Sequence, residues 1–278
     1  MLDNNGSADD LTLTLANNST IRRATGTLTT PPIFGTSMNL EYISTLGDVT
    51  TGFEIPASAT ILNNLTLTTT MIITLGSDAV VNGTLTFTNN KIVTDEYSLT
   101  AKGSVVGAGA GKFVDGKLLY PVSSPVIAQW ETGNSTDYLP VTMDIASITG
   151  SDYIASSVLD NTIDSPAGPI QPSDKALRRY VRVSKGSSIS AFSLNSIKLS
   201  YSDADVTEQG ITEAAIRLFY FDGIGWAEVP ITARDEGANT ITASGINSFG
   251  DFVIAGTNMS SYSTVNVSIL PGWNLVTV

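Results

Sequence analysis

The sequence predicts an all-β protein, and three observations carry that prediction. Apolar residues recur at every second position in many short runs, the pattern of a strand with one buried face. The 24 glycines and 11 prolines are spread along the 278 residues and separate these runs with turns. Finally, no stretch of ten residues shows a sustained 3.6-residue apolar period, and the best helical segment is the short stretch 206–215.

A returning phrase predicts that the N-terminal part is repetitive. Residues 81–85 read Val-Asn-Gly-Thr-Leu, residues 114–118 read Val-Asp-Gly-Lys-Leu, and residues 25–28 hold a fainter copy, Thr-Gly-Thr-Leu. Alternating runs lie between the copies over residues 61–119. Stacked units of this kind bury a core that no single unit could bury alone. We therefore expect a repetitive β-solenoid-like domain over residues 1–119.

Short strands are expected before the repeats, each closed by turn residues, at 11–15, 21–28, 39–43 and 49–53. Pro31 and Pro32 follow the second of these strands. Because proline cannot donate a hydrogen bond to a strand ladder, this pair marks an edge or an exit from the sheet.

The pattern changes after residue 119, where Tyr120, Pro121 and Val122 open a segment of longer period. Residues 160–174 are rich in proline and read as an exposed loop. A series of short strands then follows, at 178–183, 197–201, 216–221, 226–231, 240–243 and 252–254. Such spacing is typical of a sandwich, so we expect a β-sandwich domain over 120–257. Residues 258–278 read as a terminal strand segment or the start of a following module.

Composition excludes several classes of function. With 14 basic and 26 acidic residues the formal charge is -12, which argues against nucleic acid as a partner. The absence of cysteine and histidine removes thiol nucleophiles, Ser-His-Asp triads and imidazole metal sites. A carboxylate pair of the glycosidase type remains as the main catalytic design, but sequence alone selects no pair. We predict no enzyme, and the lack of 18 consecutive apolar residues predicts no membrane span.

Several phrases, taken in order, resemble the multi-domain secreted surface proteins of the Bacteroidetes and Ignavibacteria group, many of which leave through the type IX system. Those that carry the resemblance include Leu-Asn-Asn-Leu-Thr at 62–66, Asn-Gly-Thr-Leu-Thr at 82–86, Tyr-Leu-Pro-Val at 138–141, Ser-Phe-Gly-Asp-Phe at 248–252 and Gly-Trp-Asn-Leu-Val at 272–276. The resemblance covers residues 15–276. It implies a Thr-rich repetitive β segment followed by a β-sandwich, export, and a surface or matrix role, without supplying a site.

One acidic stretch could hold a metal ion. Asp203, Asp205 and Glu208 place carboxylate oxygens close together in sequence, as some calcium loops do. The alternative is the acidic start of a short helix, in which Asp205 accepts hydrogen bonds from the first N–H groups and Glu208 lies in the first turn. Calcium is the one cofactor that we consider. The Gly-rich run 103–112 lacks the Gly-Lys-Ser/Thr ending of a phosphate loop and reads as a turn.

Aromatic residues beside carboxylates offer a second hypothesis, a carbohydrate-binding surface. They are Trp130 with Glu131, Tyr138 with Asp137, and Trp226 with Asp222. Aromatic residues of a sandwich also commonly belong to its core. Exposed rings would favour an accessory module that binds glycans, whereas burial of all three would exclude it.

The ends of the chain suggest a structural function. Two Leu- or Val-rich strands alternate apolar with small polar residues and could add to a neighbour's sheet: Leu11, Leu13, Leu15 and Val265, Val267, Ile269. Head-to-tail repetition of such a contact gives a filament. We therefore predict a non-enzymatic extracellular protein at the cell surface, either a filament or matrix subunit or a stalk module of an adhesin. Its expected partners are further copies, other surface proteins or glycans.

Overall fold

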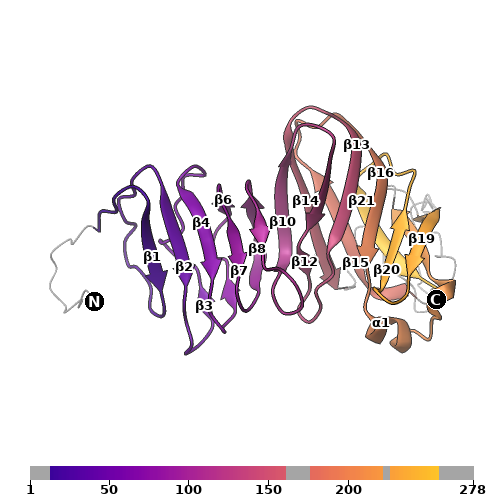
Figure 1. Cartoon of the computed structure of the whole chain (residues 1–278), viewed down its shortest axis with the longest axis horizontal. Helices are drawn as coiled ribbons and strands as arrows, with labels where there is room; N and C mark the ends of the chain where they lie inside the picture. The colour runs from indigo at the N-terminus through magenta and orange to yellow at the C-terminus, as the bar shows by residue number, and fades with distance from the viewer. Residues whose placement is uncertain (1–12, 161–175, 222–225, 257–278) are drawn as a thin grey trace, which may run out of the picture.

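The N-terminal half coils into a β-solenoid of parallel strands (Figure 1). The computed structural model describes residues 13–160, 176–221 and 226–256. Its first sheet contains β1 (Ser19–Arg23), β2 (Met38–Tyr42), β4 (Leu62–Leu67), β7 (Leu85–Phe87) and β9 (Val105–Val106). The facing strands belong to a second sheet and are β3 (Val49–Thr50), β5 (Ile73–Thr74), β6 (Ala79–Val81), β8 (Ile92–Ala101) and β10 (Val114–Val122). The all-β prediction is confirmed.

Apolar side chains of successive coils stack into columns. On the first sheet the register joins Leu65, Leu85 and Val105, and each partner lies 20 residues after the last. On the second sheet the register joins Ile73, Ile92 and Val114. All of these except Val105 are buried, so the period-two alternation of the sequence is the core pattern of the solenoid.

Asparagine and glycine at one corner hold the coils together. The Oδ1 of Asn64 accepts a hydrogen bond of 2.8 Å from the Thr84 N–H on the next coil, and Asn64 in turn donates to the Oδ1 of Asn39 on the preceding coil. At the same corner, a Cβ on Gly103 would lie 2.0 Å from the carbonyl oxygen of Gly83. Glycine is therefore required there because two backbones approach closely.

The second sheet continues into the C-terminal half, where its strands become antiparallel. Beyond β10 the order runs through β14 (Asp152–Asp160), β15 (Ala176–Lys185), β21 (Gly250–Ala255), β17 (Arg217–Phe221) and β18 (Trp226–Val229). A third sheet faces it with the order β11 (Val126–Trp130), β13 (Val141–Thr149), β16 (Ala191–Ser200), β20 (Thr240–Ala243) and β19 (Ile231–Asp235). Short β12 (Thr132–Gly133) pairs with β10. The two sheets share a core, which is the arrangement of a β-sandwich.

Strand β10 joins the two halves. It pairs in parallel with β8 on the solenoid side and antiparallel with β14 on the sandwich side. The predicted boundary between residues 119 and 120 therefore falls within a strand. One cluster of buried hydrophobic residues extends from Met38 to Ile254, so the core also passes through the junction without a break.

Three local predictions differ from the structure. Helix α1 (Asp203–Glu208) begins and ends earlier than the predicted 206–215. It ends early because Gly210 adopts φ +59° just after it. The predicted strand 226–231 divides at Pro230 into β18 and β19, which belong to different sheets. The predicted strand 21–28 ends at Arg23. Among the described residues, no helix is both long and apolar enough to cross a membrane.

Candidate functional site

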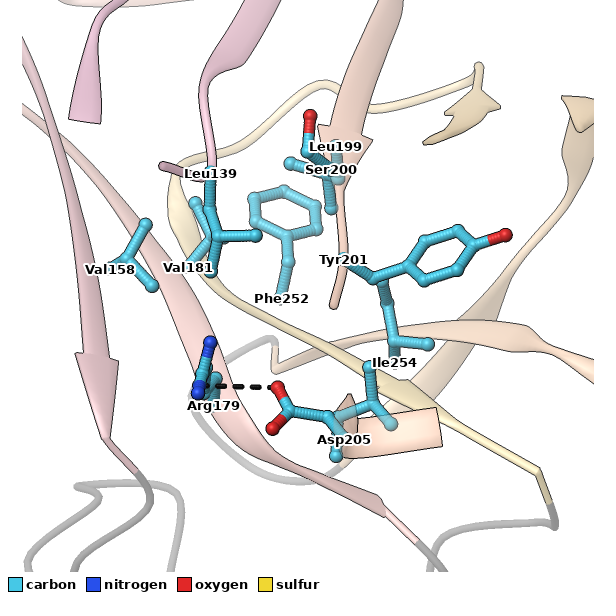
Figure 2. A pocket seen from close by; sticks show the side chains of 11 residues that line it. Leu139, Val158, Arg179, Val181, Leu199, Ser200, Tyr201, Asp205, Phe252 and Ile254 are labelled. Atoms are coloured by element: carbon cyan, nitrogen blue, oxygen red, sulfur yellow. Dashed lines mark ion pairs between the residues drawn. The ribbon is translucent and has the colours of Figure 1, made fainter. Parts of the chain in front are cut away.

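Helix α1 closes a small cavity at one end of the sandwich (Figure 2). Leu139, Val158, Val181 and Phe252 supply apolar walls, while Arg179 and Asp205 supply its polar side. The cavity measures about 20 Å³, enough for about one water molecule. It is too small for a sugar or a nucleotide.

Arg179 stands beside this cavity and is shared by three carboxylates. Its Nε lies 3.1 Å from Asp205 and 3.9 Å from Asp160, and its Nη1 donates to Asp137. Burial alone would raise the pKa of Asp137, but hydrogen bonds from Thr136 and Arg179 outweigh it and lower that pKa. Burial is the largest cause that raises the pKa of Asp205, and the neighbouring carboxylates raise it further. The attraction to Arg179 lowers this pKa but does not outweigh them.

The three predicted calcium ligands point to different partners. Asp205 faces Arg179, Glu208 lies 3.0 Å from Arg178, and Asp203 is exposed. In the described part of the chain, no three acidic side chains are arranged to hold a metal ion. Calcium at this site stays a prediction. The stretch is the acidic start of a short helix, as the alternative predicted, since Asp203 and Asp205 lie in the first turn of α1. The predicted capping bond is not formed, because Asp205 turns to Arg179 of β15, and Glu208 is the last residue of the helix.

The aromatic residues are largely committed to packing. Trp130 is fully buried, donates a 3.0 Å hydrogen bond to the Ile154 carbonyl and packs on Tyr120, so it cannot contact a sugar. Tyr138 is half-buried and its hydroxyl donates to Glu131. Trp226 is also half-buried. The predicted partner Asp222 lies outside the described residues, so a carbohydrate surface keeps only two partly covered rings.

A second ionic cluster lies at the N-terminal end of the solenoid, and this one is buried. The side chains of Arg23 and Glu54 are only 9% and 1% exposed and form an ion pair. The Oε1 of Glu54 also accepts from the Tyr42 hydroxyl at 2.7 Å and from the Gly52 N–H at 3.0 Å. Arg23 donates to the carbonyl of Thr50 in β3 at 2.9 Å. It therefore occupies the place where a further strand would pair with β3.

Of the predicted interaction strands, only Leu13 and Leu15 fall within the described residues. They flank an isolated parallel bridge between Thr14 and Ile33, and the Leu15 N–H donates to the Ile33 carbonyl at 2.9 Å. One edge of this segment is thus used within the chain. Leu11, Val265, Val267 and Ile269 lie outside the described residues.

Sequence reasoning missed both inward-pointing arginines, Arg23 and Arg179, although a signal was present. Arg22-Arg23 and Arg178-Arg179 are adjacent pairs within strands. Because successive side chains of a strand point to opposite faces, one arginine of each pair had to point inward. Arg23 and Arg179 are the inward members, and each meets carboxylates there.

Comparison with protein-family models, with curated proteins and with solved structures gives no match to this chain. The class of protein is therefore defined by its fold alone, a β-solenoid joined by a shared sheet to a β-sandwich.

Proposed function

We propose that this chain is a non-enzymatic structural protein of the cell exterior, a subunit of a surface filament or matrix. The observation that carries the proposal is the shared sheet through β10, together with the large hydrophobic cluster that spans both halves. A chain built this way has no flexible joint between its halves. It forms one elongated body, and such a body suits a spacer or a building block (Figure 1).

The chemistry of the two ionic clusters supports the same proposal. Arg23 and Glu54 hold the end of the solenoid, and Arg179 fixes α1 against β15. Both clusters are thus used in packing, and the cavity beside Arg179 has room for about one water molecule. Export and a surface location follow from the sequence resemblance and are part of the proposal.

The test is electron microscopy of the purified native material, combined with sedimentation at rising protein concentration. Regular fibres or sheets that resist heat and detergent are expected. A chain that stays monomeric at every concentration would refute self-assembly. Glycan-array binding through Tyr138 or Trp226 would then favour the accessory module.

A further inference from the structure

The first and third sheets both face the second sheet, and the strand pairing between these two is interrupted at one place. Leu118 and Tyr120 lie two residues apart on β10 and so point to the same face. Leu118 is the register partner of Leu99 in the solenoid, and Tyr120 packs on Trp130 of β11. The first and third sheets therefore cover the same face of the second sheet. No pairing joins them, since in the described residues the first ends at β9 and the third begins at β11.

The three sheets end in six strands. Three of these end strands contain charged side chains, and a fourth is bonded by one. Strand β1 contains Arg22 and Arg23, β18 contains Glu228, and β19 contains Arg234 and Asp235. Strand β3 has no charge of its own, but its carbonyl edge is bonded by the Arg23 guanidinium. Charged groups at a free edge are a common way to prevent the addition of another strand.

Strands β9 and β11 are the exception. Neither contains a charged side chain, and among the described residues no charged side chain bonds to their backbones. They also carry three of the six large apolar side chains that are exposed in the described structure: Val106 at 43%, Val126 at 41% and Ile127 at 70%. The break between β9 and β11 is thus bordered by uncharged apolar edges.

We infer that the free edge of β11 accepts residues 265–270 of a second copy as an added strand. Residues 257–278 contain no charged side chain, which matches the uncharged edge. Within them Val265, Val267 and Ile269 alternate with Asn266 and Ser268, so an extended segment would turn apolar residues to the core and polar ones to solvent. This inference rests on the proposed function, because it names the contact by which copies would join.

The contact is head-to-tail, since a C-terminal segment meets a different surface on the next copy. Contacts of that type propagate without closing and give fibres. The eight residues 257–264 stand between the described chain and the apolar run, and when extended they would span roughly 26 Å. That reach lets a copy pass its segment to a neighbour.

Charge substitution tests the acceptor edge. Ile127→Lys places a charge on β11 and is expected to abolish assembly while leaving the fold intact, because Ile127 is mostly exposed. Leu46→Lys is the matched control, since Leu46 is 85% exposed in a turn of the solenoid and gains the same charge. If the wild type assembles and Ile127→Lys assembles equally well, this inference is wrong while the proposed function stands. If the wild type never assembles, both are wrong.

Cysteine pairing tests the donor, because the natural chain has no cysteine that could mispair. A mixture of the single variants Ile127→Cys and Ser268→Cys is expected to form a disulfide-linked dimer on mild oxidation. Thr232→Cys on β19 replaces Ile127→Cys in the control and should cross-link at least tenfold more slowly. Equal cross-linking to β19 would overturn the inference. The double variant gives a further check, because a disulfide within one chain would show that the segment folds onto its own β11.

Discussion

Replacing Arg23 with methionine is expected to loosen the N-terminal end of the solenoid. Methionine keeps much of the buried side-chain volume but removes every donor. Glu54 would keep its bonds from Tyr42 and Gly52, but its 1% exposed carboxylate would have no cation. The carbonyls of Thr50 and Gly26 would each lose a 2.9 Å hydrogen bond.

The magnitude follows from the burial of both partners. Removing one member of a buried ion pair costs about 3–5 kcal/mol, because the other charge is left uncompensated. The two carbonyls lie nearer to solvent, and each lost bond contributes about 1 kcal/mol or less. A total near 4 kcal/mol corresponds to about a thousandfold change in the opening equilibrium of the end coil.

Amide hydrogen exchange is the appropriate assay, because coils of a solenoid interact mainly with their neighbours and the end can open alone. Peptides from β1 and β2 should exchange up to about a thousandfold faster in Arg23→Met, while those from β15 and β16 stay unchanged. Arg22→Met is the matched control at the adjacent position. Arg22 is 65% exposed, and its pair with Glu41 should contribute little.

A double variant decides whether charge is the cause. Arg23→Met combined with Glu54→Gln leaves no buried ion, so protection of β1 and β2 should largely return. Two results would refute the reasoning: acceleration below about tenfold in Arg23→Met, which equals about 1.4 kcal/mol, or a double variant that exchanges as fast as the single one.

Four further predictions concern packing and pH. Gly103→Ala should lower stability by about 1–3 kcal/mol, because its methyl group would meet the Gly83 carbonyl; a urea midpoint equal to wild type would contradict this. Trp130→Phe should cost about 1–3 kcal/mol, because it removes a buried hydrogen bond to the Ile154 carbonyl and leaves part of the indole's space unfilled; an unchanged melting temperature would count against it. The pKa of Asp137 is lower in the folded state than its unfolded value near 3.8, so the ionised carboxylate stabilises the fold above that pH. This stabilisation is lost as pH falls through the folded pKa. Asp137→Asn should therefore weaken the acid destabilisation seen in urea titrations. The pKa of Asp205 is raised, so its effect on stability has the opposite pH dependence and is lost as pH rises. Asp205→Asn should therefore make stability increase more steeply with pH. Parallel curves of stability against pH for the two variants would refute the assignment.

The sequence predicted the architecture because strand alternation and turn residues are local signals. It misaligned the repeats, however. Residues 81–85 turn the corner from β6 to β7, whereas residues 114–118 lie within β10 at a bulge. Gly83 and Gly116 each avoid a close contact, but Gly116 does so at the Thr94 hydroxyl in a different part of the coil. Two similar sequence phrases therefore meet two different steric requirements, and only the strand register distinguishes them.

The candidate interface was predicted only in part. The alternation of apolar and polar residues can be recognised in the sequence, so the donor residues 265–270 could be named from sequence. The acceptor could not, because β11 reads like any other strand and becomes an edge only through the order of the third sheet. Likewise, nothing local shows that Arg23 blocks β3, since the residues involved are 27 positions apart.

The direction of the strands has a mechanical consequence. In Figure 1 the strands run across the long axis of the molecule, so successive strands follow one another along its length. Tension applied between the two ends would load the interstrand hydrogen bonds in sequence, so the strands would separate one after another. Resistance to pulling would be low, whereas compression or sideways load would act on the whole packed core. Such a body is suited to holding a distance and poorly suited to serving as a tether.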